Sequence, residues 1–517
     1  MKVCIVGGGS AGWMTATTFL QCLPDYEVTL IESPDVPITG VGESTLAQIH
    51  DWIELVGIRE CEKEFMRETN ATVKHSIRFT NFLEKNSGGF HYPFGKKPID
   101  PQVWWDRQLR FGDKSPNDYA ININHIGLAS ERGKLDPSTA LQGGGDYAYH
   151  FDAIKFGQFL KKKFCQKLRH IQGHVVNFVT TDEKNIHSVV LEDSSEVEAD
   201  LFIDCTGFKS LLLGEYMGEE FFPMDHLLPN DMAWATHVPY KDKEKQMHAY
   251  THCTAIDNGW VYDIPLWTGV GTGYVYSSKY ISDDDAKQEL IDHLSDKYDP
   301  SEATFKKIHM RVGRHINTWV NNVVAIGLSA GFIEPLESNG LLLTHQPLIK
   351  LVKCLRRGKA SQLVKQYYNS DVRREFDTTA DFVAIHYAFT QREDTPYWKD
   401  IFEKEYDLEE SLLNNGTYLN GLFGYGREIF AEGHFLNVGA GLHYVASGMN
   451  ICPLNRPQPI WMRSDIDLER INKEWEEAVK QLPTPYSYLS DLYQSPDQHQ
   501  IEHPVNISQQ NLQYTPS

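Results

Sequence analysis

The sequence predicts an α/β protein, with a Rossmann-like sheet whose strands come from separate stretches of the chain and a second, largely helical region. Residues 3–6 form a short β-branched run, and a glycine-rich turn and an apolar helical stretch over residues 13–23 follow at once. A second buried strand over residues 27–32 ends in the acid Glu32. Two later strand–turn units, at residues 201–207 and 323–331, indicate that the chain returns to the same sheet.

The composition is that of a globular protein with an acidic balance. The chain has 517 residues, 41% of them hydrophobic, and its 49 Lys and Arg against 70 Asp and Glu give a net charge of −21. This charge disfavours nucleic acid and anionic membrane surfaces as partners, and no run of about 18 apolar residues predicts a membrane span. The eight cysteines include no C-x-x-C pair, so no metal site is expected. A start without a signal-peptide pattern predicts a cytoplasmic location.

The other elements follow from the spacing of apolar residues. Apolar positions between residues 153 and 171 recur with a helical period, and strand-like runs follow at residues 175–179, 186–191 and 201–204. After the strand at residues 323–326, a helix is expected over residues 341–356.

The first turn carries the dinucleotide fingerprint G-x-G-x-x-G. Gly7 makes the tight turn, Gly9 lets the backbone approach a pyrophosphate, and Gly12 packs the helix on the strand. Glu32 follows at the end of the next strand, where a carboxylate accepts a hydrogen bond from a ribose hydroxyl. NAD and FAD share this fingerprint. FAD is favoured, because the later strands come from distant parts of the chain, as in FAD-dependent two-domain oxidoreductases.

This organisation predicts a discontinuous FAD-binding domain and a substrate-binding region. The FAD-binding domain comprises residues 1–75, 145–215 and 300–350, and the substrate-binding region comprises residues 76–144, 216–299 and 351–495. Residues 496–517 are expected to form a poorly ordered tail.

A rival interpretation comes from Gly327-Leu328-Ser329-Ala330-Gly331, which matches the G-x-S-x-G nucleophile elbow of hydrolases. The motif lies between a predicted strand and a predicted helix, and histidines that could act as the base follow it. The same unit is also what a flavin domain needs near the flavin ring, so the hydrolase is the weaker hypothesis.

Several motifs together resemble the flavin-dependent halogenases of the tryptophan halogenase type. They are GGGSAGWMTA at residues 7–16, VGEST at 41–45, NATVK at 70–74, YHFDA at 149–153, GWVYDIP at 259–265 and FIEPLES at 332–338. The resemblance runs in order from Met1 to about residue 465. It departs from the usual pattern at Tyr262, where the family commonly has Trp.

The resemblance implies that reduced FAD (FADH2) and O2 convert a halide ion into hypohalous acid, which halogenates an electron-rich, indole-like aromatic. Lys74 would be the essential lysine, acting as a hydrogen-bond donor to hypohalous acid or as a haloamine, and Glu337 would stabilise the cationic ring and take its proton. Glu334 is a nearby competitor for that second role, but the E-P-L-E-S match assigns it to Glu337. Trp260, Tyr262 and Ser338 would lie at the substrate and at the barrier between it and the flavin.

The resemblance also implies the binding residues and a partner. The FAD-contact positions are Gly8, Ser10, Ala11, Gly12, Glu32, Val41, Gly42, Glu43, Ser44, Val175, Leu328 and Leu341, and the halide-binding positions are Asn339 and Gly340. Many members have Thr in place of Asn339, so the halide pocket is expected to differ in size or polarity. The chain has no NADH-binding module, which predicts a separate flavin reductase as the source of reduced FAD.

Two alternatives stay open from the sequence. One is a flavin-dependent aromatic monooxygenase on the same fold, which would hydroxylate without halide. The other is a flavoprotein-like binding module without activity, because a fold alone does not establish catalysis.

Overall fold

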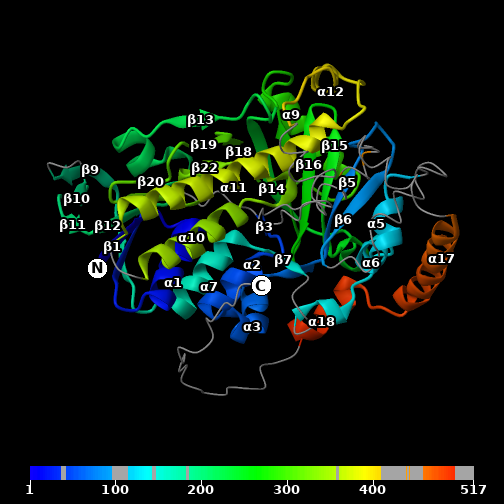
Figure 1. The fold of residues 1–517 in the computed structure, drawn as a ribbon, viewed down its shortest axis with the longest axis horizontal. Coiled ribbons are helices and arrows are strands. Elements are labelled where there is room, and N and C mark those ends of the chain that lie inside the picture. The colour runs from blue at the N-terminus through cyan, green and yellow to red at the C-terminus, as the bar shows by residue number, and fades with distance from the viewer. Residues whose placement is uncertain are drawn as a thin grey trace.

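The computed structural model describes residues 1–35, 42–95, 115–141, 147–181, 185–356, 360–408, 438, 442 and 458–494 (Figure 1). Val41 and the predicted tail at residues 496–517 therefore lie outside the described residues.

The Rossmann-like sheet has six strands in the order β20-β21-β12-β1-β2-β8. Its strands are β1 (Lys2–Val6), β2 (Glu27–Glu32), β8 (Arg169–Gln172), β12 (Leu201–Asp204), β20 (Trp319–Val320) and β21 (Val323–Ala325). All neighbours pair in parallel except β20 with β21. Residues 3–6 of β1 are buried, as expected of a parallel strand with both faces covered. The predicted α/β class and the return of distant strands to this sheet are confirmed.

One predicted helix is shorter than its apolar spacing indicated. Helix α7 (Ala153–Phe164) ends well before the predicted boundary at residue 171. After a turn, β8 pairs in parallel with β2, with Arg169 opposite Thr29. The apolar residue Ile171 thus belongs to a strand. Pairing with β8 satisfies the backbone N–H and C=O groups at the edge of β2, which would stay unpaired if the helix continued to residue 171.

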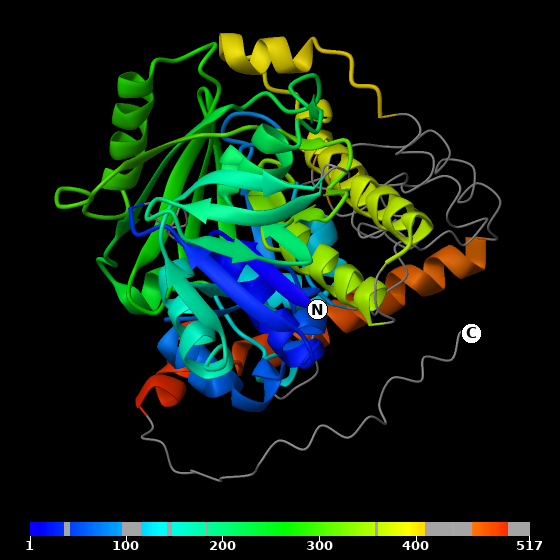
Figure 2. The same cartoon turned by 90° about the vertical axis from the view of Figure 1, so that its left-hand side faces the viewer.

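A seven-stranded sheet forms much of the second part of the molecule, for which the sequence predicted a largely helical region. Its order is β18-β14-β17-β16-β15-β5-β6, and its neighbours are antiparallel except β5 with β15. The strands are β5 (Ser76–Thr80), β6 (Gly89–Pro93), β14 (Met232–Val238), β15 (Tyr250–Ile256), β16 (Gly259–Pro265), β17 (Val270–Tyr276) and β18 (Lys306–His309). In Figure 2 the green strands of this sheet stand apart from the dark blue strands of the parallel sheet.

Three small sheets complete the strand content of the described residues. Their strands are β3 (Glu43–Ser44), β7 (Ala148–Phe151) and β4 (Thr72–Lys74); β11 (Glu196–Glu198), β10 (Ile186–Leu191) and β9 (Val175–Thr180); and β13 (Phe221–Pro223), β19 (Gly313–His315) and β22 (Gly331–Phe332). In the first of these, β7 pairs with β3 on one side and with β4 on the other. Three separate sequence motifs, VGEST, NATVK and YHFDA, therefore meet in one small sheet.

Helices surround the sheets and connect them. They are α1 (Ser10–Cys22), α2 (Ile49–Val56), α3 (Glu62–Glu68), α5 (Asp118–Ile123), α6 (His125–Glu131), α7, α8 (Lys243–Gln246), α9 (Asp283–Ser295), α10 (Leu342–Leu355), α11 (Gln362–Ala388), α12 (Pro396–Phe402), α17 (Gln458–Lys480) and α18 (Pro485–Gln494). Short turns of helix occur at η1 (Ile58–Cys61), η2 (Pro137–Thr139), η4 (Gly207–Lys209), η5 (Leu211–Tyr216), η6 (Gly327–Ser329) and η7 (Pro335–Glu337).

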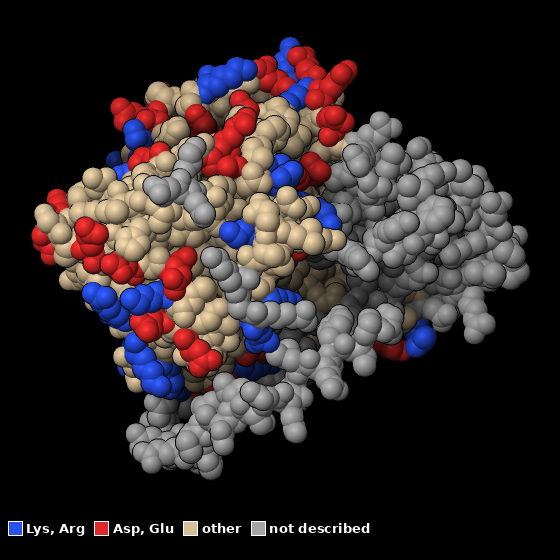
Figure 3. All heavy atoms as spheres, turned by 60° about the vertical axis from the view of Figure 1, so that its left-hand side comes forward, with Lys and Arg blue, Asp and Glu red and all other residues tan. Residues whose placement is uncertain are grey.

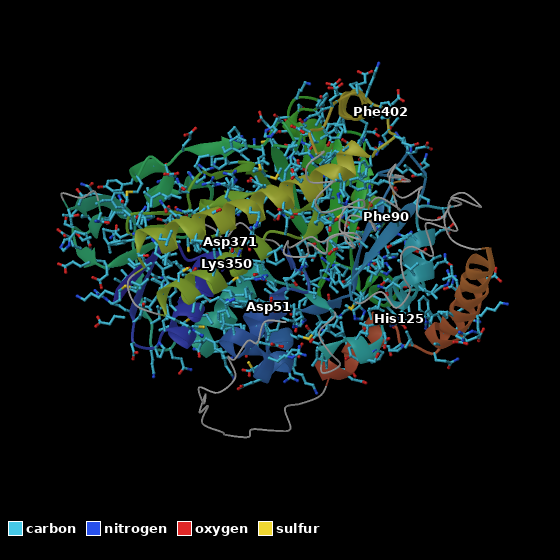
Figure 4. All side chains as sticks on the ribbon, viewed as in Figure 1. Asp51, Phe90, His125, Lys350, Asp371 and Phe402 are labelled. Carbon is cyan, nitrogen blue, oxygen red and sulfur yellow. The ribbon has the colours of Figure 1, made fainter. Side chains whose placement is uncertain are left out.

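Helix α11 spans the two main sheets. Near its start, Asn369 accepts a hydrogen bond from the backbone N–H of Trp319 on β20, and at its end Tyr387 accepts one from Trp260 on β16. Lys350 of α10 forms an ion pair with Asp371 of α11, and the two side chains meet in Figure 4. The helix is thus anchored at both ends and along its length.

The surface agrees with the charge of the chain. Figure 3 shows acidic and basic side chains interspersed on one face, without a single continuous basic field. Within the part of the chain that the structure describes, none of the helices has the length and apolar character needed to cross a membrane.

Candidate functional site

The glycine turn after β1 leaves no room for side chains at Gly7 and Gly12, whereas Gly9 faces open space. A Cβ on Gly7, whose φ is +115°, would lie 2.1 Å from the carbonyl oxygen of Cys205, and one on Gly12 would lie 1.9 Å from that of Gly7. A Cβ on Gly9 would meet nothing within 4 Å, and Gly9 is the N-cap of α1 without a side-chain cap. The turn is therefore an open cradle of backbone N–H groups at a helix N-terminus, which fits a pyrophosphate.

Glu32 reaches this turn from the end of β2. A Cβ on Gly8 would lie 2.3 Å from Glu32 Oε1, so the carboxylate lies directly beside the turn. Its other oxygen lies 2.9 Å from Nε2 of His170. Ser10 and Ala11 directly follow Gly9 and begin α1. This arrangement is the one that the fingerprint predicted for a ribose contact, and together with the turn it fits the nucleotide part of FAD.

The other predicted FAD-contact positions lie in four segments. Gly42, Glu43 and Ser44 belong to β3 or precede it, and burial raises the pKa of Glu43 to about 7. Leu328 lies in η6, next to the start of α1, because a Cβ on Gly327 would be 2.8 Å from Cβ of Ala11. Leu341 is the N-cap of α10. Val175 begins β9 after Gly173, whose N–H donates to the carbonyl of Glu32 at 3.0 Å.

Lys74 is fully buried at the end of β4, and its ammonium group is surrounded by oxygen acceptors. Nζ donates to Ser44 Oγ at 2.9 Å, to the Thr45 carbonyl at 2.9 Å and to Ser338 Oγ at 2.7 Å. Burial lowers the pKa of Lys74 to about 7. A buried lysine that titrates near neutrality is typical of a functional site rather than of a solvated surface.

Glu337 lies at the end of η7, immediately before Ser338, whose φ of 58° is left-handed. The Glu337 side chain is fully buried, and its Oε1 lies 2.9 Å from Nε2 of His386 on α11. Burial raises the pKa of Glu337, whereas His386 and Lys74 oppose this shift. Among the described residues, neither Glu337 oxygen has a partner in full hydrogen-bond geometry, and the close approach of His386 is made to Oε1. The structure thus brings Lys74, Ser338 and Glu337 together with one carboxylate oxygen free to accept a proton.

Trp260 and Tyr262 lie two residues apart on β16, with ring centroids 6.1 Å apart. The Trp260 side chain is fully buried, and burial, reinforced by the nearby Glu43 carboxylate, raises the pKa of Tyr262. A Cβ on Gly273 would lie 2.5 Å from the Tyr262 hydroxyl, so the adjacent strand makes room for this phenol. The pair forms a continuous aromatic surface on one face of the strand.

Glu334 holds Trp260 in place. It lies outside the lysine cluster, which comprises Lys74, Ser44, Thr45, Glu337 and Ser338. Its Oε2 accepts hydrogen bonds from the Tyr387 hydroxyl at 2.6 Å, from Asn230 Nδ2 at 2.9 Å and from Trp260 Nε1 at 3.4 Å. The Trp260 N–H also donates to the Tyr387 hydroxyl at 3.0 Å. Burial raises the pKa of Glu334, and these hydrogen bonds oppose the shift. Glu334 and Glu337 thus have different partners, Tyr387 and His386, which are adjacent on α11.

The predicted halide positions follow Ser338. Asn339 is buried, and its Nδ2 donates to the Ile333 carbonyl at 3.3 Å, whereas its Oδ1 has no partner within the described part of the chain. A Cβ on Gly340 would meet nothing within 4 Å. Open space therefore begins at Gly340, two residues after Ser338.

The geometry does not support the hydrolase interpretation. Ser329 lies in η6 and is fully buried, and its Oγ has no hydrogen-bond partner among the described residues. A strand, β22, follows it where a nucleophile elbow requires a helix. The predicted helix, α10, begins only at Leu342.

Sequence reasoning did not assign a role to four residues of this site. His150 lies in the motif YHFDA, and His386 is one of the histidines that follow the rival hydrolase motif. Thr251 and Tyr387 carry no local signal, because their partners come from distant segments. The region around residues 414–444, where a substrate contact would be sought, lies outside the described residues except for residues 438 and 442.

Comparisons with known proteins agree with this geometry. The family model described as tryptophan halogenase matches residues 2–453. The tryptophan 7-halogenase RebH of Lentzea aerocolonigenes is 36% identical over 424 residues, which cover 77% of this chain and 78% of that protein. The crystal structure of the tryptophan 6-halogenase SttH from Streptomyces toxytricini is 30% identical, with a TM-score of 0.85 over 95% of this chain and 99% of that one.

A second solved structure extends the likeness to the cofactor class. Xcc4156, a flavin-dependent halogenase from Xanthomonas campestris, is 28% identical, with a TM-score of 0.85 over 96% of this chain and 99% of that one. The chain therefore belongs to the tryptophan halogenase family of flavin-dependent halogenases.

Proposed function

We propose that this enzyme halogenates an electron-rich aromatic carbon with hypohalous acid, which Lys74 and Glu337 direct onto the ring. The observation that carries the proposal is the buried cluster in which the Lys74 ammonium group contacts Ser338 at 2.7 Å beside a carboxylate, Glu337, with one free oxygen. The overall change is that hypohalous acid and an aromatic C–H give an aryl halide and water.

The cofactor supplies the oxidant. Reduced FAD, when bound, would supply two electrons to O2, and together with a halide ion and a proton this gives hypohalous acid, water and oxidised FAD. The glycine turn and Glu32 would hold its nucleotide part through backbone N–H groups and a ribose contact.

Lys74 activates the halogen as a hydrogen-bond donor. Three oxygen acceptors around Nζ favour its ammonium form, and an ammonium group that donates to the oxygen of hypohalous acid makes the halogen more electrophilic. Ser338 is the acceptor that would exchange for hypohalous acid, because it directly follows Glu337 and lies two residues before the open space at Gly340. The neutral amine, which burial favours, would instead react to a haloamine.

Glu337 stabilises the cationic ring and removes its proton. Its Oε2 can accept the proton of the halogenated carbon, and burial raises its pKa, which suits a general base. His386, at 2.9 Å from the other oxygen, fixes the direction of the carboxylate.

Trp260 and Tyr262 separate the cofactor from the aromatic substrate. A wall of buried rings excludes water, which would otherwise consume the oxidant, and prevents direct oxygen transfer that would give a hydroxylated product. The halide would bind at the backbone of Asn339 and Gly340. The substrate class that fits best is an indole, in line with the tryptophan named for the relatives, and a separate flavin reductase supplies the reduced cofactor.

The test is a product assay with a panel of indoles, phenols and pyrroles, a flavin reductase, FAD and each halide in turn. We expect halogenated indole products, identified by mass and isotope pattern, only when halide is present. Hydroxylated product in halide-free buffer would instead favour a monooxygenase, and rapid NADH oxidation by the purified protein alone would contradict the need for a reductase.

A further inference from the structure

A chain of buried hydrogen-bonding side chains leads away from Lys74 through two sheets. Lys74 Nζ donates to Ser44 Oγ at 2.9 Å, and Ser44 Oγ lies 2.7 Å from Thr251 Oγ1 on β15. Thr251 Oγ1 lies 2.9 Å from Nε2 of His150 on β7. All four side chains are at most 9% exposed, so water does not compete for these contacts.

The far end of the chain is fixed by a backbone carbonyl. His150 Nδ1 lies 3.1 Å from Thr72 Oγ1, and the Thr72 hydroxyl donates to the carbonyl oxygen of Pro265 at 2.6 Å. A carbonyl oxygen only accepts, so the single hydroxyl hydrogen of Thr72 points to Pro265. Thr72 must therefore accept a hydrogen bond from the Nδ1–H of His150.

This anchor determines every other direction in the chain. Burial, reinforced by the charge of Lys74, lowers the pKa of His150 far below its usual value, so the ring is neutral and carries one N–H. With that hydrogen on Nδ1, Nε2 is an acceptor and the Thr251 hydroxyl donates to it. Thr251 then accepts from Ser44, and Ser44 has only lone pairs left for Lys74.

We propose that His150 is a positioning residue for the catalytic lysine: by fixing the direction of this chain it makes Ser44 an obligatory acceptor and so holds Lys74 as an ammonium ion. The other oxygens in contact with Nζ, the Thr45 carbonyl and Ser338 Oγ, act in the same direction. Glu337 and the Cys253 thiol are the remaining titratable groups that face Lys74, and the Phe94 ring lies 5.2 Å from Nζ. The catalytic consequence rests on the proposed function, whereas the protonation of Lys74 does not.

Two substitutions break the chain at different links. Thr251→Val removes the acceptor of the Ser44 hydrogen, which then turns toward Nζ and stabilises the neutral amine. Thr72→Val removes the anchor, so His150 gains nothing by keeping its hydrogen on Nδ1, and the tautomer with Nε2–H reverses the chain up to Ser44. Both changes have the same expected sign although they affect different strands.

The experiment follows the ionisation of Lys74 directly, by the 15Nζ chemical shift of 15N-lysine-labelled protein over a pH series. The Lys74 resonance is assigned by its loss in Lys74→Ala. We expect Thr251→Val and Thr72→Val each to raise the acid dissociation constant of Lys74 about tenfold, and Thr251→Ser and Thr72→Ser to restore it. Thr254→Val is the matched control, because Thr254 lies on the same strand and also contacts a histidine, His252, at 3.4 Å, outside the chain.

An unchanged constant in both valine variants, or a change of equal size in Thr254→Val, would overturn the proposal. Thermal unfolding checks that each variant is folded, and Thr72→Val decides the question if Thr251→Val is not. The pH profile of halogenated product per O2 consumed should shift in the same direction as the constant. If the wild-type enzyme gave no halogenated product, the proposed function would fail, and the 15Nζ titration would still decide the role of His150.

Discussion

The glycine turn and the lysine cluster differ in how the chain builds them. The glycine turn, residues 7–12, comes from one short stretch of the chain. A Cβ on Gly12 would strike the carbonyl of Gly7, one on Gly7 would strike the backbone of Cys205 after β12, and Gly9 has open space around it. The lysine cluster comprises Lys74, Ser44, Thr45, Glu337 and Ser338 and joins three segments of the chain. None of the residues that contact Lys74 Nζ lies close to Lys74 in the sequence. A local cradle tolerates change elsewhere in the chain, whereas a site assembled from distant segments depends on every sheet that brings them together.

The sharpest way to separate the two regions is Lys74→Ala. We expect product formation to fall by about a thousandfold, because the donor to hypohalous acid is lost, while flavin affinity stays at the wild-type value. Product per O2 consumed and flavin titration by fluorescence measure the two effects. Lys85→Ala, which removes an exposed lysine paired with Asp257, is the control. Equal loss of flavin binding would show that the two regions are not independent.

The converse change is made in the glycine turn. Gly12→Ala places a Cβ 1.9 Å from the carbonyl oxygen of Gly7, so we expect flavin affinity to fall about thirtyfold and the melting temperature to drop. Gly9→Ala has open space around its Cβ and should weaken flavin binding without loss of thermal stability. Flavin affinity equal to that of the wild type in both variants would contradict the proposed role of the glycine turn in flavin binding.

The proposed aromatic wall of Trp260 and Tyr262 is tested by Glu334→Gln. One Glu334 oxygen accepts a hydrogen bond from the backbone N–H of Asn230, and the other accepts one from its Nδ2. In Glu334→Gln the amide NH2 group faces one of these two donors in either orientation, and we expect this repulsion to loosen Trp260. We expect product per O2 consumed to fall about tenfold, with hydrogen peroxide in its place and flavin affinity unchanged. Glu289→Gln is the matched control, because it makes the same change in a carboxylate on α9 that accepts a hydrogen bond from the hydroxyl of Tyr274 on β17. Full product yield in Glu334→Gln would contradict the claim that the orientation of Trp260 controls how much oxidant reaches the substrate.

The smallest expected effect concerns stability and pH. Burial lowers the pKa of Lys74 to about 7 in the folded protein, below the value of 10.5 for a free lysine, so the ammonium penalty is complete below pH 7 and is lost as the pH rises toward 10.5. Lys74→Met should thus be more stable than the wild type at pH 6, and this advantage should shrink by about 1 kcal/mol per pH unit above pH 7. Urea unfolding of both proteins between pH 6 and pH 9 measures the difference. A constant difference would mean that Lys74 titrates normally.

The same contrast explains what the sequence could and could not predict. The turn, Glu32, β2, β10 and β12 were predictable because each depends on residues close in the chain. Lys74 and Glu337 could be assigned only through the family resemblance, since a lone lysine or glutamate carries no pattern. Their roles as catalytic residues stay predictions, although the structure places them in one buried cluster.

Other features depend on long-range pairing that a single segment does not reveal. Residues 165–171 have a helical apolar pattern, and only the free edge of β2 turns part of them into β8. The strands β14 to β17 are buried along almost their whole length, so they lack the alternation that identifies a half-exposed strand. His150 and His386 became functional candidates only when their partners were seen.

The anchoring of α11 sets a rule for engineering this enzyme. Asn369 near the start of the helix is tied to β20, and His386 and Tyr387 at its end face two different carboxylates. Each residue added to or removed from a helix turns everything beyond it by about 100° and shifts it by about 1.5 Å. A single insertion between Asn369 and His386 would therefore set His386 against Glu334 and the apolar Ile385 against Glu337. Residues 362–388 are best treated as one indivisible block in chimeras, to be moved together with residues 332–338 or left alone.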